Sequence, residues 1–529
     1  MRPPCDNAII RSGAVGVTCV AEARFWILIA TILASSMAFI DSTVVNVALP
    51  AMQAHFHATV MDVQWIVESY GLFLGALILV GGSLGDLFGR RLVFMAGVSL
   101  FALSSAGCGV ATNIRQLILA RSIQGMGAAL LVPGSLAIIS TSFDEKSRGQ
   151  AIGTWSGFTA ITTAVGPVLG GWLVEHASWR WAFFINIPLA ATVIAISVWH
   201  IPESRSDSTT AVDWAGALFA SLGLSGLVYS FIESTNRGWG HPLVFGNLVI
   251  GFGCLVGFTF VEAHVTSPMV PLTLFESRSF TGANLLTLFL YSAIGIFFFL
   301  FPLNLIQVQG YSATAAGAAV LPLILLIFLL SRWSGGLVAH YGARVPLTVG
   351  PIIAALGFAL FAVPSIGDGY WTAFFPAVIV LGFGMAVTVA PLTTVVMNSV
   401  GPDRVGTASG INNAVARVAG VLAIAVFGVV MVNAFASRLN HSLAYLSLPP
   451  GVLQEVQAEE IKLAGLQVPT GLSPGTRDAI KESIGNSFVF GFRIIMLICA
   501  SLSAASATVA WRVIRDQVLH KQSLGRRYG

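Results

Sequence analysis

The sequence predicts an all-helical membrane protein, and two observations lead to this prediction. Of the 529 residues, 56% are hydrophobic and only 9% are charged, and the mean hydropathy is +0.83. A soluble globular domain carries about 25% charged residues, so this chain has too little charge to cover a surface that faces water. It also contains repeated apolar runs of about 18 residues or more, which is long enough to cross a bilayer. Each run is expected to be helical because lipid offers no hydrogen-bond partner to a free backbone amide.

Hydropathy predicts fourteen transmembrane spans. They cover residues 25–50, 64–85, 92–111, 115–140, 149–174, 180–201, 213–233, 242–262, 281–308, 314–339, 345–364, 371–397, 406–432 and 487–511. No cleaved signal peptide is evident, because the first apolar run continues well beyond signal-peptide length and ends in "VALP". The protein is therefore expected to be a multi-pass protein of the inner or plasma membrane.

Basic residues predict the orientation of the chain. Most Lys and Arg residues outside the spans fall on one side, which includes the N-terminal segment 1–24 and the basic tail 512–529. The short loops opposite hold only Arg115, Arg180 and Arg237. Because short cytoplasmic loops carry an excess of Lys and Arg, both termini are expected in the cytoplasm. A long loop near 433–486 is expected on the extracytoplasmic side, where long loops count little in this rule.

The five cysteines do not suggest a redox or metal site. They are scattered without C-x-x-C spacing, and Cys108, Cys254 and Cys499 lie inside apolar runs. Cysteines in such positions behave as small hydrophobic residues. We therefore expect no disulfide and no metal ligand among them.

The chain repeats two motifs in the same register. "RGQAIGTWSG" (148–157) and "VGTASGINNA" (405–414) share G-x-A-x-G, and "GGSLGDLFGRR" (81–91) resembles "GGLVAHYGAR" (335–344). Each pair lies eight spans apart, which predicts six-helix halves at 25–201 and 281–511, separated by a linker and two-helix insert at 202–280. Chance similarity among Gly- and Ala-rich helices would readily explain one repeated motif. It explains two repeats in the same register poorly. A parallel repeat of this kind is typical of transporters whose substrate path runs between the halves.

Two acids stand inside apolar runs. Asp41, in "AFIDSTVVNVALP", lies near the middle of the first span, and Glu68 lies about one turn inside the outer end of the second. Desolvation disfavours a charged carboxylate, so an acid at this depth fits a proton carrier that takes a cation once the proton leaves. The alternatives are a packing role for Asp41, through a hydrogen bond to a nearby hydroxyl, and contact of Glu68 with the outer headgroups.

Polar residues at depth also occur on the fourth and thirteenth spans. Arg121 is charged at any physiological pH and needs an anionic partner or a wet cavity, unless it reaches the outer surface. Gln124 lies on the same helix face one turn away. On the thirteenth span, Asn412, Asn413 and Arg417 form a second polar group.

Several motifs resemble those of the major facilitator superfamily. "GGSLGDLFGRR" is similar to its loop signature, "LILARSIQGMGAA" (117–129) to its fourth-helix Arg motif, and "AVGPVLGG" (164–171) to the Gly-Pro motif of its antiporters. "IDSTVVNVALP", "QWIVESY" (64–70) and "WRWAFFINIP" (179–188) resemble the fourteen-span drug:proton antiporter branch in particular. The resemblance implies the major facilitator fold, two six-helix halves plus two extra helices, and a role for Arg121 in proton handling.

Two of these motifs carry site residues. In the loop signature, glycines permit a tight cytoplasmic turn, and Asp86 paired with Arg90 would latch the inward side; the alternative is that the arginines only set topology. The residues concerned are Gly82, Gly85, Asp86, Gly89, Arg90 and Arg91. In the antiporter motif, a helix breaker beside small residues would form a hinge for outward opening, or else serve ordinary packing. Its residues are Gly166, Pro167, Gly170 and Gly171.

The resemblance implies export of hydrophobic drugs or toxic compounds, with cationic ones as one option, in exchange for protons. Such a transporter needs no cofactor, because the proton gradient drives it, and it is neither an enzyme nor a nucleic-acid partner; we expect it to work as a monomer. One alternative is an exporter of a single metabolite or an anionic compound, with Arg121 and Arg417 as anion partners. Another is a membrane sensor or scaffold that transports nothing. An ATP-driven pump is disfavoured, because no G-x-x-x-x-G-K-[ST] loop occurs.

Overall fold

The computed structural model describes residues 21–143, 145–205, 213–400, 404–446, 448–469 and 472–514. Within these ranges the regular structure is helical and no strand occurs, which confirms the predicted fold class. Thirteen helices there are long and apolar enough to cross a membrane. α6 (Glu145–His176) covers the predicted fifth span but is not one of the thirteen, so the total of fourteen is not confirmed. The N-terminal residues 1–20 and the tail from 515 lie outside the described residues.

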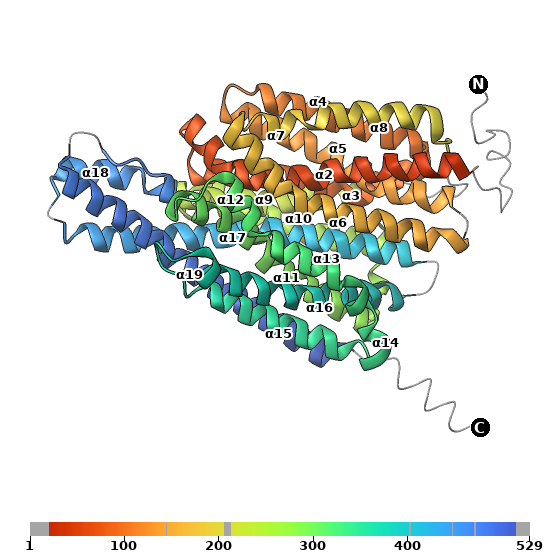
Figure 1. Cartoon of the computed structure of the whole chain (residues 1–529). Coiled ribbons are helices and arrows are strands. Elements are labelled where there is room, and N and C mark those ends of the chain that lie inside the picture. Colours follow the sequence, from red (N-terminus) through yellow and green to blue (C-terminus); the bar gives the residue numbers. More distant parts are fainter. Residues whose placement is uncertain are drawn as a thin grey trace. The chain divides into compact units, whose positions relative to one another are not determined.

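The helices follow the order of the predicted spans (Figure 1). Their bounds are α2 Ala21–Phe56, α3 Val60–Phe88, α4 Arg90–Val110, α5 Ile114–Ser142, α6 as given above, α7 Trp181–Phe184, α8 Asn186–His200, α9 Trp214–Arg237, α10 Pro242–His264, η1 Leu272–Glu276, α11 Arg278–Leu303, η2 Asn304–Val308, α12 Ala313–Ala319, α13 Leu321–Gly335, α14 Leu337–Tyr341, α15 Arg344–Phe361, η3 Tyr370–Phe374, α16 Phe375–Asn398, α17 Val405–Leu443, α18 Pro450–Ala458, η5 Glu460–Gly465 and α19 Pro474–Val513.

The chain divides into two compact units. The first comprises residues up to Ala51, Trp65–Leu227 and Val249–Pro271, and the second comprises Met52–Gln64, Val228–Leu248 and the residues from Leu272 onward. Within the first unit α4 packs along α5 and α8, and within the second α15 packs against α16 and α19, while α11 packs against α17 and α19. Helices α9 and α10, which form the predicted insert, contribute to both units.

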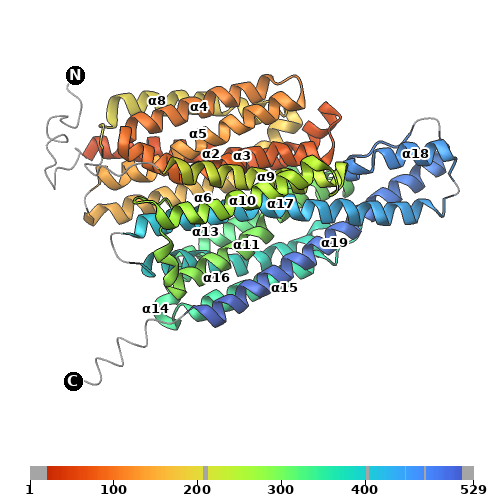
Figure 2. The same ribbon diagram turned by 180° about the vertical axis from the view of Figure 1, so that it is seen from behind.

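Two helices of the second unit are far longer than a membrane span. α17 has 39 residues and α19 has 40, which corresponds to roughly 60 Å each at 1.5 Å per residue. α18 and the adjoining ends of α17 and α19 extend beyond α11, α15 and α16 in both views (Figures 1 and 2). The segment 433–486, for which the sequence predicts a loop, is thus mostly helical.

Glycine allows α4 and α5 to approach closely in the first unit. A Cβ atom on Gly127 of α5 would lie 2.7 Å from the backbone nitrogen of Phe101 and 3.0 Å from the carbonyl oxygen of Gly97, both on α4. A Cβ atom on Gly97 would in turn lie 2.9 Å from the backbone nitrogen of Leu131 on α5. In lipid, helices associate mainly through van der Waals packing, and small residues at their crossings allow the backbones to approach closely.

We predict that Gly127→Ala destabilises the protein by about 1–3 kcal/mol, because the added methyl overpacks a backbone contact. Gly253→Ala in α10 is the matched control, since nothing lies within 4 Å of a Cβ at that helical position. Thermal unfolding of the purified protein in detergent measures both effects. Equal melting temperatures for the two variants would contradict the predicted role of Gly127 in the helix crossing.

Candidate functional site

Asp41 is held by three donors in the interior of the first unit. Its side chain is fully buried on α2. Arg121 Nη1 of α5 donates to Asp41 Oδ2 at 2.5 Å, and Gln124 Nε2, one turn further along α5, donates to Asp41 Oδ1 at 2.8 Å. Asn186 Nδ2 of α8 lies 3.4 Å from the same Oδ1. The carboxylate is therefore part of a buried ion pair, which offsets the cost of its charge.

Arg121 is correspondingly locked by its surroundings. The residue is 1% exposed, its Nε donates to the carbonyl oxygen of Ile66 at 3.1 Å, and its Nη1 also donates to Gln124 Oε1 at 2.7 Å. Its guanidinium carbon lies 4.2 Å from the ring centroid of Tyr70, a cation–π contact. Arg121 thus has an anionic partner at depth and does not reach the surface.

The polar network includes residues that sequence analysis missed. Ser105 Oγ of α4 accepts from Gln124 Nε2 at 3.1 Å and from Asn186 Nδ2 at 2.9 Å, and itself donates to the carbonyl oxygen of Phe183 at 2.9 Å. Asn186 has the one amide side chain in the "WRWAFFINIP" motif, so its presence in that motif could have indicated a role for it. Ser105 stands among small residues in "LSSAGCG" and carries no such signal.

Glu68 has no comparable partners. It is fully buried on α3, and neither side-chain oxygen has a hydrogen-bond partner in the described structure. Two residues along a helix turn the side chain by about 200°, so Glu68 lies on the face of α3 opposite Ile66 and Tyr70, which contact Arg121. An acid in contact with headgroups would be exposed, and Glu68 is not. A carboxylate buried without a donor is costly to keep as an anion.

The glycines of the antiporter motif pack α6 against α2 next to Asp41. A Cβ atom on Gly166 would collide with Thr43 Oγ1, and one on Gly170 would lie 2.8 Å from Val44 Cγ1. Pro167 lies inside α6, and Gly171 is buried. The motif therefore permits a close helix contact two or three residues after the buried acid; its role as a hinge remains a prediction.

The loop signature forms the turn between α3 and α4. Arg90 pairs with Asp86, with Nε and Nη2 at 2.9 and 2.7 Å from Oδ1. Gly89 has φ +118°, a conformation that L side chains rarely adopt. A Cβ atom on Gly85 would lie 3.9 Å from Arg90 Cα, and one on Gly82 would lie 3.8 Å from Pro133 Cβ, both ordinary van der Waals contacts. The ion pair that the latch requires is thus formed, although Asp86 is 46% exposed and such pairs contribute only about 0–1 kcal/mol.

Glu203 completes this turn, and sequence analysis missed it because it lies outside the motif. Its Oε1 and Oε2 accept from the backbone nitrogens of Arg91 and Leu92, each at 3.1 Å. These amides open α4 and have no partner within the helix. Arg91 Nη1 donates to the carbonyl oxygen of Ile201 at 3.1 Å. The segment after α8 therefore caps the N-terminus of α4.

The polar residues predicted on the thirteenth span, Asn412, Asn413 and Arg417, lie in different environments. Asn412 Nδ2 of α17 donates to Thr287 Oγ1 at 2.7 Å and to Asn284 Oδ1 at 3.1 Å, both on α11. Asn413 is exposed and donates to the carbonyl oxygen of Ser409 in its own helix. Arg417 is partly buried. Asn412 therefore links α17 to α11, whereas Asn413 forms its hydrogen bond within α17.

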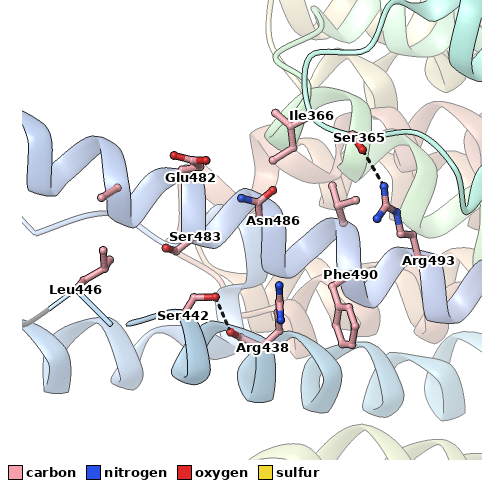
Figure 3. A pocket seen from close by; sticks show the side chains of 12 residues that line it. Ser365, Ile366, Arg438, Ser442, Leu446, Glu482, Ser483, Asn486, Phe490 and Arg493 are labelled. Carbon is pink, nitrogen blue, oxygen red and sulfur yellow. Dashed lines mark hydrogen bonds between the residues drawn. The ribbon is translucent and has the colours of Figure 1, made fainter. Parts of the chain in front are cut away.

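A cavity of about 440 Å³ lies between α17, α19 and the turn at Ser365 and Ile366 (Figure 3). Arg493 closes one side by donating to the carbonyl oxygens of Val363 and Pro364, each at 3.0 Å, and to Ser365 Oγ at 2.9 Å. Arg438 lies over the ring of Phe490, at 5.6 Å from its centroid. None of the predicted site residues lines this cavity.

We predict that Arg121→Gln destabilises the protein by about 3–5 kcal/mol, because it leaves the Asp41 carboxylate buried without its countercharge. The double variant Asp41→Asn with Arg121→Gln should regain much of this loss, since neither charge remains. Thermal unfolding of the purified protein measures the cycle. Arg237→Gln, which removes a partly exposed pair with Glu233, is the control and should change little. Additive losses for Asp41→Asn and Arg121→Gln would contradict a coupled pair.

We predict that Glu203→Ala loosens the start of α4 at a cost of about 0.5–2 kcal/mol, the usual cost of removing a helix cap. Hydrogen exchange should accelerate at the amides of Arg91 and Leu92. Glu203→Gln should keep most of the protection, because its amide oxygen still accepts, and Asp86→Asn should leave these amides unaffected. Unchanged exchange in Glu203→Ala would show that the cap is dispensable.

Known proteins resemble this chain over most of its length. The model of the Major Facilitator Superfamily matches residues 31–424. The tetracenomycin C resistance and export protein of Streptomyces glaucescens is 31% identical over 91% of this chain and 90% of the relative. The multidrug resistance protein Stp of Mycobacterium tuberculosis is 32% identical over 92% of this chain and 91% of the relative.

A solved structure has the same fold. A bacterial homologue of the human lysosomal transporter Spinster aligns with a TM-score of 0.61 at 17% identity, over 94% of this chain and all of that one. The matching family model and the two relatives agree with the family that the motifs of the first unit resemble. This chain therefore belongs to the major facilitator superfamily.

Proposed function

We propose that this chain exports drug-like compounds from the cell in exchange for protons. Two relatives that align with nine-tenths of its length are named for drug resistance, and one of them for export. The motifs "IDSTVVNVALP" and "AVGPVLGG" surround the buried network of the first unit and favour the drug:proton antiporter branch. The observation that carries the proposal is the buried Asp41–Arg121 pair, with Glu68 left unpaired on the neighbouring helix.

Protonation of Asp41 would act as the switch. An ionised Asp41 holds Arg121, Gln124 and Asn186 in one arrangement. A neutral carboxyl group attracts the guanidinium far less, so Arg121 would have to find another acceptor or a wetter position. Since the network joins α2, α5 and α8, a change in the protonation state of one residue alters the contacts among three helices. That is the coupling an antiporter needs between proton binding and helix movement.

Glu68 would supply the second ionisable position. Among the described residues no donor reaches its oxygens, so the cationic group of a drug could compensate its charge while proton coupling stays with Asp41. Neutral compounds would not need Glu68, and we propose that it extends the substrate range to cations.

The proposal also covers the membrane topology, the transport cycle and the roles of the two glycine-containing motifs. The chain would lie in the cell membrane with both termini in the cytoplasm and with the α18 region outside, and it would work as a monomer by alternating access. The loop signature would steady the inward side, and the α6 glycines would permit outward opening. Export of anionic compounds is disfavoured, because Arg121 is already paired with Asp41. A non-transporting scaffold would fail a counterflow assay.

We predict that Asp41→Asn abolishes uphill export driven by a pH gradient in proteoliposomes, because an amide does not titrate. Counterflow exchange of the same compound, which needs no net proton movement, should persist. Glu233→Gln is the control, since Glu233 pairs with Arg237 on α9 away from the network. Undiminished gradient-driven export by Asp41→Asn would refute the switch.

In the same assay, Glu68→Gln should reduce export of a cationic dye by about tenfold relative to a neutral dye of similar size. This ratio corresponds to about 1.4 kcal/mol of lost charge interaction. Equal losses for both dyes would instead assign Glu68 to the proton path or to packing.

A further inference from the structure

A second pair of buried acids lies in the first unit, away from the network around Asp41. Asp213 directly precedes α9, and its Oδ1 accepts from the backbone nitrogen of Gly216 at 2.7 Å, the geometry of a helix N-cap. Glu262 lies two residues before the end of α10, and its Oε2 accepts from the backbone nitrogen of Val270 at 2.9 Å. Asp213 is 7% exposed and Glu262 is 3% exposed.

These two hydrogen bonds involve only one oxygen of each carboxyl group. The other two, Asp213 Oδ2 and Glu262 Oε1, are buried and have no hydrogen-bond partner in the described structure. Both converge on Gly216, where a Cβ atom would lie 2.5 Å from the first and 3.0 Å from the second. Two ionised carboxylates held this close in a buried site repel each other strongly, so such pairs do not both stay charged.

We infer that Asp213 and Glu262 share one proton, with Glu262 Oε1–H donating to Asp213 Oδ2. This single hydrogen bond satisfies both unpartnered oxygens and leaves one negative charge on the pair. The proton belongs on Glu262 because the N-terminus of α9 stabilises negative charge on Asp213, whereas the C-terminus of α10 disfavours it on Glu262. The pair thereby ties the start of α9 to the end of α10 and to the turn that reaches Val270.

A bridging divalent cation is the competing explanation for the two oxygens. Ca²⁺ takes about 6–8 oxygen ligands, and Mg²⁺ demands near-octahedral geometry. Within the described residues, no group of three or more His, Cys, Asp or Glu side chains could hold a metal ion. A proton needs only the two oxygens that are present. The pair also lies outside the proposed coupling residues, so the inference does not rest on the proposed function.

Infrared spectroscopy of the purified protein tests the inference directly. The protonated-carboxyl C=O absorption of the wild type should lose one component in Glu262→Gln, where a neutral Glu68 would still absorb, and should stay unchanged in Glu233→Gln, whose carboxylate is ion-paired. Glu262→Gln should keep its melting temperature within about 2 °C of the wild type, because the amide N–H donates to Asp213 in place of the hydroxyl. Glu262→Ala should melt lower, since it removes the donor.

Three results would overturn the inference. Identical carboxyl bands in the wild type and Glu262→Gln would show that Glu262 carries no proton. A clearly higher melting temperature for Glu262→Gln would show that two ionised carboxylates repel in the wild type. A rise in the melting temperature on adding Mg²⁺ or Ca²⁺ to the wild type, absent in Glu262→Gln, would assign the oxygens to a cation.

Discussion

A buried carboxylate paired with a buried guanidinium constrains the whole first unit. Asp41 and Arg121 compensate each other's charge where neither could stay alone. Gln124 of α5 and Asn186 of α8 also donate to Asp41, and both donate in turn to Ser105 of α4. Helix positions in this unit are therefore fixed by charge compensation as well as by packing, and the glycines of α6 bring a further helix against α2 beside the pair.

Asp41 and Glu68, the acids of the first two spans, differ in their surroundings although both lie in apolar runs of the sequence. Asp41 faces donors on neighbouring helices, whereas Glu68 meets none in the part of the chain that the structure describes. Asp213 and Glu262 show a third arrangement, in which a backbone amide satisfies one oxygen of each acid and the other oxygen of each is buried beside Gly216. The environment, rather than the residue type, thus decides whether a buried acid pairs with a base, stands unpaired or meets another acid.

Hydropathy and motifs predicted the helical membrane fold and three residues of the buried network, Asp41, Arg121 and Gln124, because burial cost leaves few polar residues inside spans. The sequence could not say which acid Arg121 would meet, since both stood at similar depth; helix rotation decides that. It also gave no signal for Ser105, an ordinary small residue, or for Glu203, which reaches α4 from 112 residues further along the chain. Hydropathy predicts a loop over 433–486 because the polar sequence there has no apolar run, although much of it is helical.

The length of α17 and α19 has a practical consequence. Most of a major facilitator protein is hidden by its detergent belt or nanodisc, which leaves few features for aligning particle images. Here two helices run roughly 60 Å, about twice the thickness of a hydrocarbon core, and α18 caps their shared end (Figure 1). This projection offers an epitope for antibody fragments and a recognisable feature for aligning particle images in electron microscopy.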